Sequence, residues 1–361
     1  MTTAESNEIL AKQYQEEIER ALKRYSRALD YAEHPPEVPV GQSPKEVIWT
    51  RNKAKLYHYV PTVEKRHNIP ILMIYALINK PYILDLRPGS SLVEYLLGQG
   101  FEIYLLDWGT PGPEDRNLKI DDYVLDYMPR AVKHTLLHSG AKEVSLLGYC
   151  IGAVLTVTFA ALHSELPLRN LILMAAPLDF SEQGLLRTWL DPQNFDVDQL
   201  ASAYGLIPAE MVDFGSKMLK PVNNFVLTYS SFFDKLWDDR AVESWLSMQK
   251  WVNDGVPFSS EAFKQWIKDF YLGNKLTTGQ LYLRGQRVNL SKIKSNLLNI
   301  IAEKDHIALP SQSKPIMNLV SSPDKEQLIL PGGHVGLVVG RNATKGLWPA
   351  LSAWMSKRSD S

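Results

Sequence analysis

The sequence predicts an α/β protein in which a mostly parallel sheet carries helices on both faces and a helical cap is inserted. Between residues 70 and 177, apolar runs of strand length alternate with stretches of helical periodicity, which is the pattern of a parallel sheet covered on both sides. From about 180 to 285 the strand-like runs disappear and aromatic residues concentrate, including five of the nine tryptophans. Because the sheet pattern resumes near residue 297, we interpret this aromatic region as a cap between two strands of one sheet.

Composition and charge exclude several classes of protein. The 361 residues are 45% hydrophobic and 22% charged, which is ordinary for a globular domain. A net charge of −1 argues against a nucleic-acid-binding surface. A single cysteine excludes an intrachain disulfide and suits a reducing compartment, so we expect a cytoplasmic location. The first 20 residues are polar and no run of about 18 apolar residues exists, so we expect neither a secretory signal nor a transmembrane segment.

The amino-terminal region has the periodicity of an amphipathic helix over residues 6–33. We place an N-terminal helical segment at residues 1–45. Two interpretations of the helix stay open: its apolar stripe packs on the protein's own core, or it docks a partner subunit. The stripe comprises Ile9, Leu10, Tyr14, Ile18, Leu22, Tyr25 and Leu29.

The first strands of the sheet come next. Residues 46–49 and 55–59 alternate their faces like short strands, and the uniformly apolar residues 71–76 predict a buried strand. In hydrolase-like sheets the loop after such a strand supplies one N–H of an oxyanion hole. Leu77 and Ile78 are the candidates for that N–H, and the sequence does not choose between them.

Three histidines in this part of the chain are interpreted as structural. His58 lies in a predicted strand, where we expect its hydrogen bonds to be satisfied. His134 and His138 are four residues apart on a predicted helix that ends at Gly140. They lack the glutamate of the H-E-x-x-H pattern, so we interpret them as ordinary helix residues rather than zinc ligands.

The central motif is a Gly-x-Cys-x-Gly sequence at residues 148–152. An apolar run of strand length leads into it and a helix-like run over 154–162 follows, which is the context of a nucleophile elbow. Without this context, the lone Cys150 would be interpreted as a buried, inert thiol. In the elbow it is a candidate nucleophile, and the backbone N–H of Ile151 is a candidate oxyanion donor.

An acid and a histidine follow in the order that a catalytic triad on this kind of sheet requires. Asp305 comes just after a predicted strand at 297–302, and His334 comes just after one at 328–330. Open α/β sheets place their sites beyond the carboxyl ends of the strands. We therefore expect Cys150, Asp305 and His334 to meet there as nucleophile, acid and base.

These features predict an α/β-hydrolase fold. Its first part spans residues 46–179 and holds the elbow, the cap or lid spans 180–285, and the second part spans 286–361 and carries the aspartate and the histidine.

With these residues placed, the sequence resembles the catalytic subunit of class III polyhydroxyalkanoate synthases over nearly its whole length. The family's cysteine, aspartate and histidine correspond to Cys150, Asp305 and His334, and His306 also matches a family histidine. Two positions depart from the family: Ile151 stands where glutamine is frequent, and Ala153 stands where a second glycine is frequent. The matching stretches are residues 75–82, 104–109, 148–152, 263–271 and 331–336.

The resemblance implies polymerisation of (R)-3-hydroxyacyl-CoA, chiefly 3-hydroxybutyryl-CoA, with release of CoA and without a cofactor or a metal. Cysteine suits this chemistry because acyl transfer from CoA to Cys150 exchanges one thioester for another and keeps the acyl group activated. His334 would be the base, and Asp305 would hold its tautomer or help to activate the attacking hydroxyl. His306 would either assist the reaction directly or only pack against its neighbours.

The resemblance also implies partners. We expect a second synthase subunit, a homodimer or higher hetero-oligomer, and association with polyester granules in the cytoplasm. Trp348 and Trp354 near the carboxyl terminus either touch a granule or belong to the core.

Two other functions compete with the polymerase. A cysteine-nucleophile thioesterase or other hydrolase of the same fold would use the same triad. A non-catalytic granule-binding scaffold would not need the triad at all. The aromatic insertion favours the polymerase because a polymerase has to exclude water from its acyl-enzyme.

Overall fold

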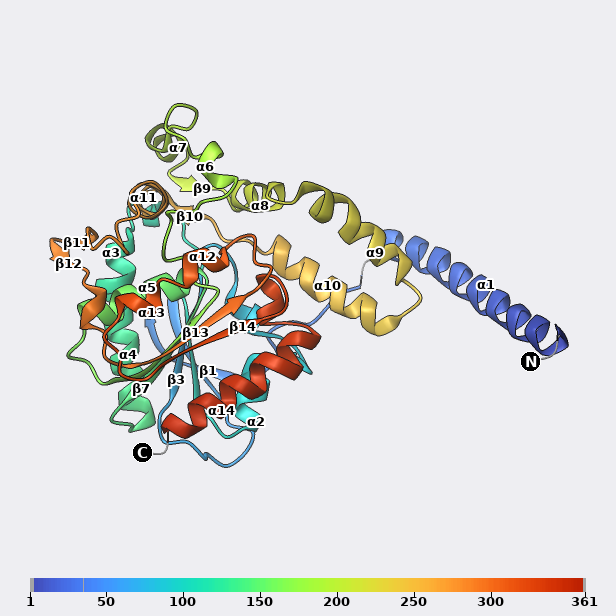
Figure 1. The fold of residues 1–361 in the computed structure, drawn as a ribbon, viewed down its shortest axis with the longest axis horizontal. Coiled ribbons are helices and arrows are strands. Elements are labelled where there is room, and N and C mark those ends of the chain that lie inside the picture. The colour runs from blue at the N-terminus through green and yellow to red at the C-terminus, as the bar shows by residue number, and fades with distance from the viewer. Residues whose placement is uncertain (1–2, 35, 360–361) are drawn as a thin grey trace.

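The computed structural model describes residues 3–34 and 36–359 and has the predicted α/β architecture (Figure 1). One sheet of eight strands runs in the order β1-β2-β6-β3-β7-β8-β13-β14. The pairs from β6 to β14 are all parallel, whereas β1 and β2 pair antiparallel with each other and β2 pairs antiparallel with β6. The strands are β1 (Lys45–Arg51), β2 (Ala54–Tyr59), β3 (Ile71–Ile74), β6 (Ile103–Asp107), β7 (Val144–Tyr149), β8 (Leu168–Met174), β13 (Asn296–Ala302) and β14 (Lys325–Leu330).

The middle of the sheet is the core of the molecule. Every residue of β3 and β7 is buried, as their uninterrupted apolar sequences predict for strands covered on both faces. Because β3 lies between β6 and β7, the order of strand addition reverses at β3. Such a reversal opens a crevice at the carboxyl ends of the strands, where open α/β sheets bind their ligands.

Helices cover both faces of this sheet. In Figure 1, α14 and α2 lie together on one face, while α4 and α5 lie toward the other. The helices of this core are α2 (Leu92–Gly98), α3 (Ile120–Asp122), α4 (Met128–Ser139), α5 (Ile151–Leu162), α12 (Pro310–Ser313), α13 (Ile316–Leu319) and α14 (Trp348–Ser359). Single turns and short strands join them: η1 (Pro81–Leu84), β4 (Asp85–Arg87), β5 (Ser90–Ser91), η2 (Pro113–Asp115), η3 (Tyr123–Tyr127), β11 (Tyr282–Leu283), β12 (Gln286–Arg287), η6 (Leu290–Lys292), η7 (Val335–Leu337) and η8 (Ala343–Leu347).

The cap between β8 and β13 is mainly helical, as predicted. It also holds a two-stranded sheet of β9 (Leu206–Ile207) and β10 (Phe258–Ser259), strands too short to leave a sequence pattern. The cap helices and turns are α6 (Leu186–Trp189), α7 (Val197–Tyr204), α8 (Ala209–Met218), η4 (Asn223–Leu227), α9 (Thr228–Asp234), α10 (Asp239–Asn253), α11 (Ser260–Gln265) and η5 (Trp266–Leu272).

The apolar side chains of the cap differ in burial. Trp251, Phe258, Trp266, Phe270 and Tyr271 are buried in the hydrophobic core. Another set lies on the surface. The exposed large apolar residues of the segment from α8 to α9 are Met211, Phe214, Val222, Phe225, Val226, Leu227, Tyr229 and Phe233.

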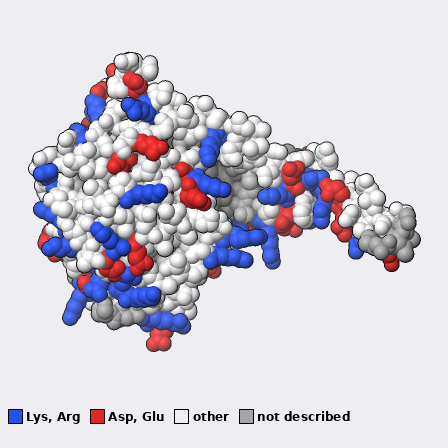
Figure 2. Space-filling model, in the orientation of Figure 1, with Lys and Arg blue, Asp and Glu red and all other residues white. Residues whose placement is uncertain are grey.

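The amino-terminal helix α1 (Thr3–Glu33) projects from the body as an arm (blue in Figure 1). Its apolar stripe is between 47% and 68% exposed, so the interpretation that the stripe packs on the protein's own core is wrong. The second half of the arm meets the cap: Tyr25 contacts Phe233 edge to face, and Arg27 donates to the carbonyl oxygen of Leu236 over 3.0 Å. Basic and acidic residues intermix along the arm and over the body in the view of Figure 2.

The carboxyl-terminal helix α14 belongs to the core. Trp348 and Trp354 are only 4% and 5% exposed, so contact of these two residues with a granule surface is contradicted. Arg358 lies over the ring of Trp354 and pairs with Asp324 through two nitrogen–oxygen contacts of 2.7 and 2.8 Å. No helix within the described residues is both long enough and apolar enough to cross a membrane.

Candidate active site

The predicted elbow is present between β7 and α5. Cys150 has φ 57° and ψ −125°, a strained conformation for a residue with a side chain. A Cβ atom on Gly152 would lie 2.2 Å from the carbonyl oxygen of Ile74, and one on Gly148 would lie 2.5 Å from the Cα of Ala153. Both positions therefore require glycine, because β3, β7 and α5 pack against one another at the turn.

Asp305 and His334 meet at the carboxyl ends of β13 and β14. The ring Nδ1 of His334 donates to Oδ2 of Asp305 over 2.7 Å, and both residues are buried, at 7% and 5% exposure. The other carboxylate oxygen, Oδ1, accepts from the backbone N–H groups of Ile307 at 2.9 Å and Ala308 at 3.0 Å. These donors hold the carboxylate of Asp305 in one orientation.

The ring of His334 and the side chain of Cys150 border the same cavity and interact electrostatically. Since Nδ1 is engaged by Asp305, Nε2 is the ring nitrogen left to exchange a proton with the sulfur. Burial by itself lowers the pKa of His334, but the negative charges of Cys150 and Asp305 outweigh it and raise that pKa to about 10. The arrangement therefore favours the imidazolium form of His334 beside the cysteine. The structure brings together the three residues that the sequence predicted as a triad.

The oxyanion candidates come from the start of α5 and from the loop after β3. Ile151 is the first residue of α5, so its N–H is one that a helix leaves without an internal partner. On the loop after β3, Ile78 borders the same cavity as Cys150, whereas Leu77 borders a separate crevice beside Trp108. The choice between Leu77 and Ile78 as the second donor stays a prediction.

His306 faces the cavity beside His334. Its Nδ1 is buried and has no hydrogen-bond partner among the described residues. Burial lowers the pKa of His306, and the positive charges of Lys220 and His334 lower it further against the opposing charge of Asp305. The ring is therefore held in its neutral form near the triad.

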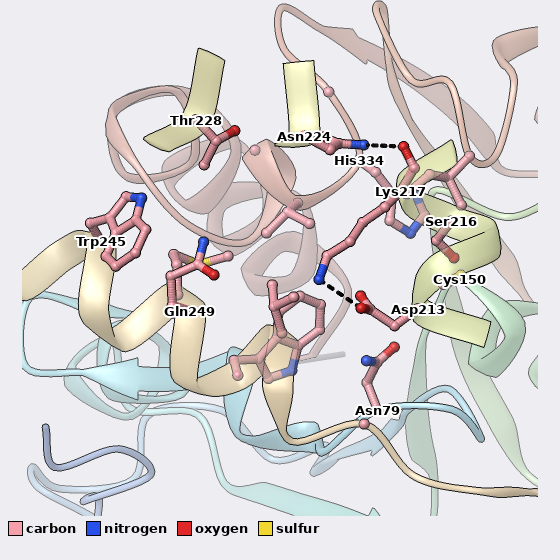
Figure 3. A pocket seen from close by; sticks show the side chains of 18 of the residues that line it. Asn79, Cys150, Asp213, Ser216, Lys217, Asn224, Thr228, Trp245, Gln249 and His334 are labelled. Atoms are coloured by element: carbon pink, nitrogen blue, oxygen red, sulfur yellow. Dashed lines mark hydrogen bonds and ion pairs between the residues drawn. The ribbon is translucent and has the colours of Figure 1, made fainter. Parts of the chain in front are cut away.

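A cavity of about 700 Å³ lies between the sheet and the cap and opens onto Cys150 and His334. Figure 3 shows Lys217 reaching into it from α8, where its ammonium group pairs with Asp213 at 2.6 Å. Asn224 donates to the carbonyl oxygen of Lys217 over 2.9 Å. Sequence reasoning missed these polar residues, because an acid and a base four residues apart look like an ordinary solvated helix pair.

Several hydrogen bonds attach the cap to the loop that follows β3. The indole Nε1 of Trp251 donates to the carbonyl oxygen of Lys80 over 2.8 Å. The backbone N–H of Val256 donates to the carbonyl oxygen of Ile78 over 2.8 Å, and the hydroxyl of Tyr82 donates to Asp254 over 2.7 Å. The cap and the oxyanion loop are thus held as one unit.

The fold and this site define an α/β-hydrolase-fold protein with cysteine at the nucleophile position. A family model described as alpha/beta hydrolase fold matches residues 69–340, and one described as the poly-beta-hydroxybutyrate polymerase (PhaC) N-terminus matches residues 27–96. The poly(3-hydroxyalkanoate) polymerase subunit PhaC of Haloferax mediterranei is 41% identical over 346 residues, 96% of this chain and 70% of that protein. The subunit of the same name from Allochromatium vinosum is 37% identical over 324 residues, 89% of this chain and 90% of that protein.

The chain therefore belongs to the family of class III polyhydroxyalkanoate synthase catalytic subunits, and it is a polyhydroxyalkanoate polymerase, an acyltransferase. Solved structures add support for the fold alone. A lipase-esterase related protein from Clostridium acetobutylicum is 14% identical and superposes with a TM-score of 0.50 over 85% of this chain and 100% of that one.

Proposed function

We propose that the polymerase joins (R)-3-hydroxyacyl units from their CoA thioesters, chiefly 3-hydroxybutyryl-CoA, through an acyl intermediate on Cys150. The observation that carries the proposal is that Asp305 is hydrogen-bonded to His334, whose ring borders the same cavity as Cys150. Asp305 fixes the tautomer of His334, and His334 keeps the sulfur in its nucleophilic form.

Acylation begins with attack of the Cys150 thiolate on the thioester carbonyl carbon. The oxyanion that forms is met by the N–H of Ile151 and by an N–H from Leu77 or Ile78. The carbon–sulfur bond to CoA then breaks, and the departing CoA sulfur takes the proton of the His334 imidazolium. One thioester is exchanged for another, so the acyl group remains activated.

Elongation uses the same residues in reverse. A hydroxyl group of the growing chain or of the next monomer attacks the carbonyl carbon of acyl-Cys150. His334, now neutral, takes the hydroxyl proton as the carbon–sulfur bond breaks and the thiolate forms again. Asp305 stabilises the resulting imidazolium. His306 either assists at this step or only packs beside the ring. No cofactor or metal enters these steps.

Exclusion of water separates this reaction from that of a thioesterase of the same fold. The cavity roof is supplied by cap side chains that include Trp245, Met248 and Trp251, and by the closed Asp213–Lys217 pair. A roof of this kind limits competition from water at the acyl-cysteine stage. Its opening would admit substrate and release CoA.

We further propose a second synthase subunit, assembly as a homodimer or higher hetero-oligomer, and localisation at cytoplasmic polyester granules. Two surfaces support an assembly: the exposed apolar stripe of α1 and the exposed apolar residues of the cap from α8 to α9. They are adjacent, because Tyr25 of α1 contacts Phe233 of α9. A partner that covered both would bury apolar area now open to water.

The test is release of CoA from 3-hydroxybutyryl-CoA together with sizing of the product, for the parent chain and Cys150→Ala, with and without a candidate second subunit. Polyester formation that the substitution abolishes, in a variant with unchanged circular dichroism, supports the proposal. Steady formation of free 3-hydroxybutyrate without polymer would support a hydrolase instead. Turnover retained by Cys150→Ala would remove the acyl-cysteine step.

A further inference from the structure

Three side chains at the far edge of the sheet form a cluster that the polymerisation chemistry does not use. Glu46 comes from β1, His58 from β2 and His138 from α4; we call them the edge cluster. Two strands, β6 and β3, lie between β2 and the cysteine-bearing β7 in the sheet order. The edge cluster is therefore separate from the active site.

The distances within the edge cluster are short. Oε1 of Glu46 lies 3.1 Å from Nδ1 of His58 and 3.9 Å from Nε2 of His138. One nitrogen or oxygen atom from each of the three residues lies within 4.8 Å of the other two, and the imidazole centres are 4.6 Å apart. The residues come from chain positions 46, 58 and 138, so no local motif marks them.

The tautomer of His138 follows from its neighbours. The single hydroxyl proton of Tyr104 goes to the carboxylate of Glu102, which accepts it over 2.6 Å. Tyr104 must then accept at its oxygen from Nδ1–H of His138, 2.8 Å away. In the neutral ring this leaves the lone pair on Nε2, which lies 3.9 Å from Oε1 of Glu46. In that form two acceptors lie close to each other, an arrangement that a cation between them stabilises.

His58 has a corresponding arrangement on the buried side. Its side chain is 11% exposed, and its Nε2 has no hydrogen-bond partner among the described residues although a Glu102 oxygen lies 3.7 Å away. Coordination through Nδ1 would place the ring proton on Nε2, directed at Glu102. Lys65 already neutralises Glu102 over 2.6 Å. Glu46, in contrast, has close contacts with these two imidazoles and none with a lysine or arginine among the described residues.

We propose that Glu46, His58 and His138 bind one divalent transition-metal ion of the zinc type. Two imidazoles and one carboxylate are a donor set that zinc takes at about 2.0–2.2 Å. Glu102 and Tyr104 would act as the outer partners that orient the two rings, which is how proteins commonly hold histidine ligands. Because Glu46 is 62% exposed, its side chain can adjust to the ion and a water can take the fourth position. The ion would tie the two edge strands to α4.

The test is zinc and cobalt binding to the tag-free, EDTA-treated full chain. The Cys150→Ala background is used because the Cys150–His334 pair is itself a possible zinc ligand set. We expect one zinc per chain, a rise in the melting temperature on adding zinc, and a visible cobalt spectrum of low coordination number. His138→Gln and Glu46→Gln should each weaken zinc binding by about 10-fold or more.

His134→Gln is the matched control. His134 lies one turn before His138 on α4, but its ring stacks on Trp49, so this variant should bind zinc as the parent does. Glu46→Gln keeps the test valid if a histidine variant is unstable, because the glutamate side chain is mostly exposed. Absence of stoichiometric binding, or equal affinity in the parent, His138→Gln and Glu46→Gln chains, would overturn the proposal.

Discussion

The indole of Trp251, on cap helix α10, donates its only N–H to the carbonyl oxygen of Lys80 over 2.8 Å. Lys80 stands at the end of the loop that carries Leu77 and Ile78, the two candidates for the second oxyanion donor. A movement of the cap is thus transmitted to the loop beside Cys150. The position of the cap and the preparation of the oxyanion site are therefore linked mechanically.

The first prediction concerns this bond. Trp251→Phe retains an aromatic ring in the cavity wall but removes the N–H donor, so the loop loses one restraint. We expect kcat to fall by about 10-fold, which corresponds to about 1.4 kcal/mol of transition-state stabilisation, with a smaller change in KM. Initial rates of CoA release over a range of substrate concentrations measure both.

Trp245→Phe is the control for the Trp251 variant. The Nε1 of Trp245 has no hydrogen-bond partner among the described residues, and its ring stacks on Phe232 with centres 3.7 Å apart. Loss of that N–H should leave kcat within about twofold of the parent value. Equal losses in the two variants would show that ring shape, rather than the bond to Lys80, is what matters.

The second prediction concerns the charge of His334. Its pKa is raised to about 10, chiefly because the negative charge of Cys150 opposes the effect of burial. The ring should therefore stay protonated from below pH 6.5 up to about pH 10 in the parent chain. In Cys150→Ala the negative charge at residue 150 is absent, so burial should lower the pKa of His334. Nitrogen-15 chemical shifts of the ring across this pH range report the protonation state. A titration unchanged by Cys150→Ala would contradict the ion-pair description.

The third prediction separates Asp305 from His306. Asp305→Asn removes the carboxylate charge that stabilises the imidazolium form of His334. Its amide N–H₂ also favours the neutral ring with the proton on Nε2, which then cannot accept the proton of the attacking hydroxyl. We expect polymer synthesis to fall by at least about 100-fold with little loss of folding. If the ring of His306 only packs, His306→Gln should lower the rate of polymer synthesis by less than about threefold. A loss comparable to that of Asp305→Asn would give His306 a direct part in proton transfer.

The fourth prediction concerns the elbow. Gly152→Ala places a Cβ 2.2 Å from the backbone oxygen of Ile74, so β3 or α5 must shift. We expect a loss of unfolding free energy of about 2 kcal/mol or more, as for overpacked cores. Gly98→Ala, which meets nothing within 4 Å at the end of α2, should be neutral or slightly stabilising. Urea unfolding of both variants measures the difference.

Sequence reasoning succeeded where local pattern and chemistry coincide. The elbow was predictable because strand, glycine turn and helix are contiguous. Asp305 and His334 were predictable because each follows the end of an apolar strand-like run within a few residues. Sequence reasoning failed where the burial of an apolar surface depends on which other part of the molecule covers it. The periodicity of α1 reveals an apolar stripe but not whether the protein itself buries it, and the same uncertainty applied to Trp348 and Trp354, which the structure buries.

Contacts between segments that are distant in the sequence could not be predicted either. Lys217 and Asp213 point into the cavity only because the cap folds back over the sheet, and nothing in their spacing distinguishes them from an exposed pair. His58 was interpreted as a strand histidine and His138 as an ordinary helix residue, and the eighty positions between them gave no sign that the two rings meet.

Cys150 is the only thiol in the chain, and it is 8% exposed beneath the cap. The unmodified protein is therefore its own single-site chemical reporter. Any maleimide or dye that reacts with sulfur marks one position, and the speed of marking measures how often the roof lifts. Bulky and small reagents applied in parallel would gauge the width of the opening, with no introduced cysteine to disturb the enzyme.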